Sequence, residues 1–194
     1  MSYDYVDIHT HSPRADVLSP RMSGVHPWDA EKGCTLPHFE ECDIVGETGL
    51  DYTREVSYEA QQRLFEAHLN AAERLGKPVV LHVVRSFEDV MLTLKRYRLQ
   101  GVVFHGFTGS EQQAARCIER GYYLSFGHRS LRSPKTRRVI ASLPTERLFC
   151  ETDDSSNPTI EQIYAEVAAL RSTSIEELKA QIISNYEKLF ASNG

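Results

Sequence analysis

Six histidine and carboxylate side chains, each at the end of a short apolar run, are the residues of this sequence best suited to chemistry. They are His9, His11, Glu47, His82, His105 and Asp153. Imidazole nitrogens and carboxylate oxygens together are ligands for zinc, manganese, iron or nickel. On a strand, His9 and His11 point to the same side and can bind one cation. The set is large enough to hold two divalent ions, with one carboxylate bridging them.

Each of these residues taken alone also has a structural explanation. A single His-x-His pair is common at surfaces and in cores, and a lone histidine such as His82 is more often a hydrogen-bonded buried residue than a ligand. Here, however, six of the eight histidines come at or just after the ends of successive apolar runs. Chance placement would scatter them over helices and loops, so the combination favours a metal site.

Three further residues near the same ends are candidates for substrate contact: His26, Arg85 and His128. For the two histidines, a purely structural role is about as well supported, whereas the arginine is the nearest candidate for a phosphate clamp. Asp51 would either orient Glu47 or shape the loop that follows it. His38 and His68 lie on stretches interpreted as helical, and we expect both to be structural.

Short apolar runs alternate with helix signals along the chain, and these elements must position the polar residues. Seven runs are predicted as strands: 6–11, 22–28, 43–47, 79–82, 102–105, 122–126 and 148–153. Several are continuously apolar, which is typical of strands covered on both faces of a parallel sheet. Capping boxes beginning at Ser110, Thr159 and Ser174 predict three of the helices.

This alternation predicts an α/β fold made of βα units, in a single domain over residues 1–194. A complete eightfold barrel usually needs about 250 residues, and the stretch between His11 and Val25 has no room for a helix plus a strand. We therefore expect an incomplete, seven-stranded TIM-like parallel β/α barrel, with an open doubly wound sheet as the alternative. In such a barrel, the carboxyl ends of the strands meet on one face.

Composition limits the class of protein and its partners. The chain has 41% hydrophobic and 25% charged residues and no apolar run long enough for a membrane span. Residues 1–6 carry no secretory signal, and the cysteines at 34, 42, 117 and 150 lack metal or redox spacing. We expect a cytoplasmic protein with reduced thiols, without a membrane partner or an obligate protein partner.

The net charge of −5 argues against non-specific coating of DNA. It does not argue against a phosphodiester substrate, because bound cations invert the local field. One dense basic stretch comprises Arg129, Arg132, Lys135, Arg137 and Arg138. It could follow a DNA backbone, but a solvated helix face is slightly favoured.

Six ordered motifs give the sequence a resemblance to a known family. They are Asp7-Ile-His9-Thr-His11, Gly24-Val-His26-Pro-Trp28, Val45-Gly-Glu47-Thr-Gly-Leu-Asp51-Tyr, Leu81-His82, Phe104-His105-Gly-Phe107-Thr-Gly109 and Glu151-Thr-Asp153. In order and position they resemble TatD-type deoxyribonucleases, which are amidohydrolase-like barrels, over most of the chain. The resemblance implies a metallo-dependent hydrolase that cleaves phosphodiester bonds of DNA with two divalent ions (Mg²⁺, Mn²⁺ or Zn²⁺).

The resemblance also assigns roles to the candidate ligands. The pair His9–His11 would bind one ion, and His82 with His105 would bind the other. Glu47 would bridge the two ions and take part in catalysis. Asp153 would bind metal and act as the catalytic base.

Three departures from the family pattern concern the parts that contact substrate. The first helix and second strand of the family are missing. After Asp153 the family usually continues with an Ala-Pro-Tyr segment and a long loop, whereas here residues 154–158 lead directly to a helix. Arg85 stands three residues after His82, where the family often has an arginine two residues after. Two alternatives therefore stand beside DNA hydrolysis. The same metal site could hydrolyse an ester or amide, such as an aminoacyl ester or lactone, or the protein could be a non-catalytic, metal-stabilised binding module.

Overall fold

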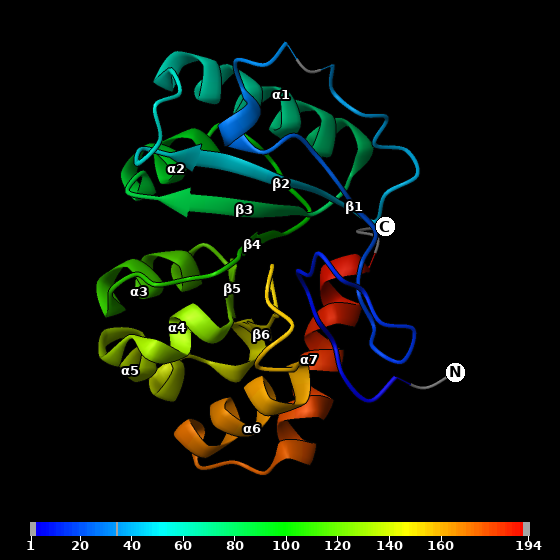
Figure 1. Cartoon of the computed structure of the whole chain (residues 1–194), viewed down its shortest axis with the longest axis vertical. Helices are drawn as coiled ribbons and strands as arrows, with labels where there is room; N and C mark the ends of the chain where they lie inside the picture. Colours follow the sequence, from blue (N-terminus) through cyan, green and yellow to red (C-terminus); the bar gives the residue numbers. More distant parts are fainter. Residues whose placement is uncertain (1–2, 34, 192–194) are drawn as a thin grey trace. The chain divides into compact units, whose positions relative to one another are not determined.

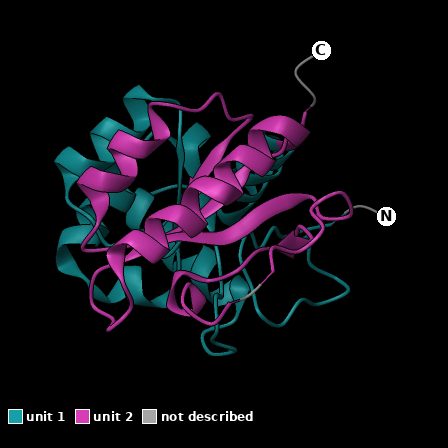
Figure 2. Ribbon diagram, turned by 90° about the horizontal axis from the view of Figure 1, so that it is seen from above, with its two compact units in different colours: residues 1–19, 105–189 teal, residues 20–104, 190–194 magenta. Residues whose placement is uncertain are grey.

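The computed structural model describes residues 3–33 and 35–191 and divides the chain into two compact units. Unit 1 contains residues 1–19 and 105–189, and unit 2 contains residues 20–104 and 190–194 (Figure 2). The strand pairings found within each unit are parallel. This arrangement confirms the prediction of βα units. That the whole chain is one domain stays a prediction.

Unit 2 is built on four parallel strands that pair in chain order (Figure 1). They are β1 (Met22–Ser23), β2 (Ile44–Asp51), β3 (Val79–Val84) and β4 (Val102–Phe104). The connecting elements are the 3₁₀ helix η1 (Pro27–Asp29) and the helices α1 (Tyr58–Leu75) and α2 (Phe87–Leu94). Ile44, Leu50, Phe65 and Val80 are fully buried and form part of its core.

The long helix α1 has a capping residue at each end. The Ser57 hydroxyl accepts a hydrogen bond from the Ala60 N–H, and Gly76 ends the helix in the left-handed conformation. Phe65, Leu69 and Ala72 lie on one face at helical spacing and are fully buried. This face fixes the helix against the core of unit 2.

Two glycines allow strands β2 and β3 to approach closely. Gly46 and Gly49 have φ values of 138° and 141°, a region that side-chain-bearing residues rarely adopt. A Cβ atom on Gly49 would lie 2.1 Å from the carbonyl oxygen of His82, and one on Gly46 would lie 2.4 Å from that of Val80. Because Glu47 stands between the two glycines, this contact brings it beside the strand that carries His82.

Unit 1 contains the parallel pair β5 (Tyr123–Phe126) and β6 (Leu148–Cys150). Its helical elements are α3 (Glu111–Glu119), α4 (His128–Arg132), α5 (Pro134–Ser142), η2 (Thr145–Arg147), α6 (Ile160–Arg171) and α7 (Ile175–Phe190), of which the last residue falls in unit 2. The predicted capping boxes at Ser110 and Thr159 are both present. Ser174 and Glu177 also exchange the expected hydrogen bonds at the start of α7.

The first predicted strand, 6–11, is not a continuous strand. Val6 bridges to Leu18 and Thr10 bridges to Asp153, each as an isolated parallel pair. Between these bridges, the Ile8 N–H donates to the Cys150 carbonyl at 3.2 Å. The structure therefore has six strands in the part of the chain it describes, and not the predicted seven. The reason is that residues 12–19 supply only one pairing residue, Leu18, where a second strand would supply a ladder.

Two further expectations concern the cysteines and membrane spans. Cys42, Cys117 and Cys150 are buried free thiols, while Cys34 lies outside the described residues. Among the helices that are described, none is long and apolar enough to cross a membrane.

Replacing Gly49 with alanine tests the close approach of β2 and β3. We expect Gly49→Ala to lower the free energy of unfolding by at least about 2 kcal/mol, because backbone atoms of β3 must move. Gly33 has a positive φ of 66° but no atom within 4 Å of a Cβ position. As the matched control, Gly33→Ala should cost only about 1 kcal/mol. Urea denaturation measures both, and equal losses would show that β3 does not resist a side chain at Gly49.

Candidate metal centre

In unit 2, the side chains of His26, Glu47 and His82 come together. Each offers one ligand atom, and these atoms all lie within 4.8 Å of one another. The Oε1 atom of Glu47 is 2.7 Å from His82 Nδ1 and 3.3 Å from His26 Nε2. His26 stands at the N-cap of η1, Glu47 in β2 and His82 in β3. Imidazole and carboxylate donors in this arrangement suit a divalent transition metal.

The second ring nitrogen of His82 faces another carboxylate. Nε2 of His82 lies 3.1 Å from Oδ2 of Asp51, a buried residue at the end of β2. A neutral imidazole carries one N–H and cannot donate to carboxylates on both sides. With the proton on Nε2, the lone pair of Nδ1 faces Glu47. A cation between Nδ1 and Glu47 would satisfy both acceptors, so His82 and Glu47 fit a metal site.

Asp51 is held as an anion by its surroundings. Burial acts to raise the pKa of Asp51, but hydrogen bonds from Thr53, Trp28 and His82 outweigh it and lower that pKa to about 2. The indole N–H of Trp28 donates to Oδ2 at 2.7 Å, and the backbone N–H of Thr53 donates to Oδ1 at 2.9 Å. The structure thus places Asp51 against His82, which is a carboxylate–histidine pair of the kind that orients metal ligands.

His26 has a different role from His82, because its Nδ1 accepts a hydrogen bond from the backbone N–H of Trp28 at 3.2 Å. A neutral His26 must then carry its proton on Nε2, the atom that faces Glu47. That nitrogen is a hydrogen-bond donor and has no lone pair for a metal. The geometry is that of a residue that orients Glu47 or donates to a bound substrate.

In unit 1, His9, His105 and Asp153 offer a second group of ligand atoms within 4.8 Å of one another. Nε2 of His9 lies 3.3 Å from Oδ1 of Asp153, and the rings of His9 and His105 are 4.2 Å apart. Nε2 of His11 lies 3.6 Å from the same Asp153 oxygen. The side chain of His9 is 1% exposed and that of His11 is 58% exposed. The group therefore extends from the interior of unit 1 to its surface.

Backbone hydrogen bonds fix Asp153 beside the two histidines. The Asp153 N–H donates to the His9 carbonyl, and the Asp153 carbonyl accepts from the His11 N–H, both at 2.9 Å. Strand β6 ends at Cys150, and Asp153 adopts a left-handed φ of 57°. Aspartate is one of the few residues enriched in this conformation. The predicted strand to residue 153 is thus too long, but its last residue still pairs with Thr10.

A second buried carboxylate, Glu151, lies behind His105. Its Oε1 accepts from the Gly106 N–H at 2.6 Å and is 3.4 Å from His105 Nδ1. Its Oε2 is buried, with no hydrogen-bond partner in the part of the chain that is described. A buried carboxylate in this state is costly unless positive charge lies near. The surroundings of His105 therefore also fit a cation.

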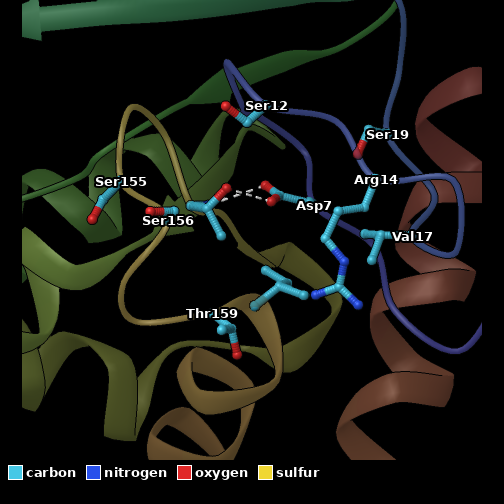
Figure 3. A pocket seen from close by; sticks show the side chains of 10 residues that line it. Asp7, Ser12, Arg14, Val17, Ser19, Ser155, Ser156 and Thr159 are labelled. Atoms are coloured by element: carbon cyan, nitrogen blue, oxygen red, sulfur yellow. Dashed lines mark hydrogen bonds between the residues drawn. The ribbon is translucent and has the colours of Figure 1, made fainter.

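A pocket in unit 1 is lined by two charged groups that already have partners. It measures about 200 Å³, below the usual size of ligand pockets, and ten residues line it (Figure 3). The buried Asp7 carboxylate accepts from the Thr152 hydroxyl at 2.6 Å, and burial raises the pKa of Asp7 to about 7. Arg14 at the same pocket is already paired with Asp16 and Glu161. Neither Asp7 nor Arg14 therefore offers an unpaired charge to a ligand.

The remaining histidines and Arg85 belong to none of the metal-capable groups identified among the described residues. His128 begins α4 and is half-buried, and Arg85 is exposed after β3 with a φ of 53°. Their contact with substrate stays a prediction. The structural role of His68 is confirmed, since Nε2 accepts from the Val25 N–H and Nδ1 bonds to the Leu64 carbonyl. The helical interpretation of His38 is wrong, because it lies in a loop.

The basic stretch is largely paired with acidic side chains of unit 1. Arg129 contacts Asp154, Arg138 contacts Glu111, and Arg137 contacts Glu166. Exposed pairs of this kind add at most about 1 kcal/mol each. The contacts favour the interpretation of this stretch as a solvated helix face.

Parallel βα units that carry histidines and carboxylates at or near their strand ends define an α/β protein with candidate metal-binding groups. The sequence model of the family described as "TatD related DNase" matches residues 7–191. The chain therefore belongs to the TatD family, which confirms the resemblance predicted from its motifs.

Two relatives indicate the degree of similarity. The chain is 36% identical over 163 residues to "Uncharacterized metal-dependent hydrolase YjjV" of Escherichia coli, which covers 75% of this chain and 62% of that protein. It is 31% identical over 198 residues to "3'-5' ssDNA/RNA exonuclease TatD" of Citrobacter rodentium, which covers 87% of this chain and 75% of that protein. The chain is thus similar to only part of each relative.

Solved structures support the fold. The YjjV crystal structure from Escherichia coli matches with a TM-score of 0.75 and 28% identity, over 91% of this chain and 78% of that one. A TatD family hydrolase from Entamoeba histolytica matches with a TM-score of 0.76 over 90% and 75%, at 19% identity, which shows the fold alone. These matches confirm the predicted class, an incomplete parallel β/α barrel of the metallo-dependent hydrolase type.

The contact between Asp51 and His82 predicts that Asp51 sets metal affinity. We expect Asp51→Asn to weaken metal binding about 10- to 100-fold, because the amide cannot hold the His82 Nε2–H as a carboxylate does. Titration of the metal-free protein with Mn²⁺ or Zn²⁺ measures this. The matched control is Asp89→Asn, since Asp89 accepts only from the Tyr52 hydroxyl in the hydrogen bonds identified for it. Unchanged affinity in Asp51→Asn would contradict the orienting role.

Proposed function

We propose that the protein is a cytoplasmic, metal-dependent phosphodiesterase that hydrolyses DNA with two divalent ions. The observation that carries the proposal is the presence, in each unit, of buried or half-buried imidazole and carboxylate groups whose ligand atoms lie within 4.8 Å of one another. Family membership supports it, as do relatives whose names describe a metal-dependent hydrolase and a single-stranded DNA and RNA exonuclease. Mg²⁺, Mn²⁺ and Zn²⁺ are the candidate ions, since each accepts ligands from this donor set.

The proposed ligands are His9, His11, His105 and Asp153 in unit 1, and Glu47 and His82 in unit 2. The family resemblance assigns the bridging position to Glu47, whose carboxylate has two oxygens. It also assigns His82 and His105 to one ion.

When bound, the divalent ions would polarise the phosphoryl group and stabilise charge on the leaving oxygen. Asp153 would orient the attacking water and accept its proton. Its side chain is 21% exposed, so water reaches it, and its backbone is fixed at both N–H and carbonyl. His26 would donate its Nε2–H either to Glu47 or to a phosphoryl oxygen.

Metal removal tests the function directly. We expect EDTA to abolish hydrolysis of a labelled single-stranded oligonucleotide, and added Mg²⁺, Mn²⁺ or Zn²⁺ to restore it, because the carboxylates alone repel a phosphate. Elemental analysis of the purified protein should find about two ions per chain. A metal-loaded protein that cleaves carboxylic esters but no phosphodiester would favour the ester alternative. One that cleaves neither would favour a binding module.

The assignment of the base is tested by Asp153→Asn. Asparagine keeps the size of the side chain but loses its charge and basicity, so we expect kcat on DNA to fall at least about 100-fold. Metal content should be largely kept, as measured by elemental analysis. Asp154→Asn is the matched control, since the neighbouring Asp154 is exposed and pairs with Arg129. A near wild-type rate in Asp153→Asn with metal bound would mean that no protein base is needed.

A further inference from the structure

Trp28 is held rigidly beside the unit 2 ligand group while much of its ring faces solvent. It is the only tryptophan of the chain, and it is 42% exposed. Its indole N–H donates to Asp51 at 2.7 Å, and its ring meets that of His26 edge-on at 4.4 Å. The guanidinium carbon of Arg54 lies 3.9 Å above the ring centre. The orientation of the indole is therefore fixed on several sides.

Exposure of an aromatic ring by itself has no functional meaning, because apolar residues are common on protein surfaces. The contact with Asp51 distinguishes Trp28. The same Asp51 oxygen accepts from the indole and faces Nε2 of His82. The rings of Trp28 and His82 are 5.8 Å apart. The exposed indole thus lies immediately beside residues that would act on a phosphate.

An indole with a guanidinium against it has the chemistry of a base-stacking surface. Nucleobases stack on aromatic rings and on arginine planes, and they do so with little sequence preference because every base has a π face. A base within a duplex already stacks on its neighbours and cannot stack on a protein ring. Arg54 adds a positive charge that a backbone phosphate can pair with. The arrangement therefore suits an unpaired nucleotide.

We propose that Trp28 and Arg54 form a stacking subsite for an unpaired base next to the scissile phosphate. The inference rests on the proposed function and names the residues that would hold one base of the strand. The base stacks on the indole and the guanidinium binds the adjoining phosphate. Asp51 couples the two functions, because the carboxylate that orients His82 also fixes the plane of the stacking ring.

Fluorescence provides a direct test, because Trp28 is the single tryptophan of the chain and all tryptophan emission comes from it. The metal-loaded protein is titrated with a short phosphorothioate oligothymidine, which resists hydrolysis. We expect saturable quenching of tryptophan emission. An abasic strand of the same length and a blunt duplex should quench weakly or not at all. Equal quenching by the abasic strand would overturn the proposal, because binding would then not involve a base.

Kinetic discrimination tests the subsite without relying on fluorescence. For the wild type, we expect KM on an abasic end to exceed KM on a thymidine end by about tenfold, the value of one base–aromatic stack. Trp28→Leu should reduce this ratio to about one, while Trp28→Phe, which keeps a stacking ring, should retain most of it. A ratio unchanged in Trp28→Leu would overturn the proposal.

Tyr58 offers a matched control in the same unit. It is 54% exposed and stacks with Tyr52 at 4.4 Å. We expect Tyr58→Leu to keep the thymidine-to-abasic ratio. An equal loss in Tyr58→Leu would mean that exposed aromatic surface in general binds the strand, which overturns the Trp28 subsite. DNA hydrolysis without base discrimination would reject the subsite alone, whereas absence of DNA hydrolysis would reject the proposed function.

Discussion

The ionised carboxylate of Asp51 is the constraint on which the candidate metal-binding group of unit 2 depends. A buried charge costs several kcal/mol unless hydrogen-bond donors surround it. Here the donors are the indole of Trp28, the backbone and hydroxyl of Thr53, and a ring nitrogen of His82. Each donor is fixed in return. The loop after β2, the tautomer of His82 and the plane of Trp28 are therefore consequences of one carboxylate.

In unit 1, the comparable constraint is on the backbone of the first residues. Val6 and Ile8 are fully buried, so their neighbouring N–H and carbonyl groups need partners. The Asp7 N–H donates to the Leu18 carbonyl at 2.9 Å, and the Ile8 N–H donates to Cys150 on the other side. Leu18 thus satisfies this edge, although residues 12–19 form no strand. His9 and His11 keep their positions because the other edge is bonded to residues 150–153.

The sequence predicted the parts of the structure that depend on local patterns. The caps of α3 and α6 follow from single residues and their neighbours three positions on, and the ligand candidates follow from the ends of apolar runs. The strand count, the loop position of His38 and the early end of β6 depend on partners far along the chain, and local patterns do not encode them. On the predicted strand 148–153, Glu151 would lie on the same side as Asp153, which marks it as a candidate site residue. Its contact with His105, however, joins residues 46 positions apart.

The same limit explains why two histidines with equal sequence signals have different roles. His26 and His82 both end an apolar run, and both face Oε1 of Glu47. The tautomer of each ring is set by the group behind it. The backbone N–H of Trp28 donates to Nδ1 of His26, so the Nε2–H of His26 faces Glu47. The Asp51 carboxylate accepts from the Nε2–H of His82, so the lone pair of Nδ1 faces Glu47. The group behind each ring therefore suits His82 to metal binding and His26 to hydrogen-bond donation. Residue types at strand ends cannot distinguish these two roles.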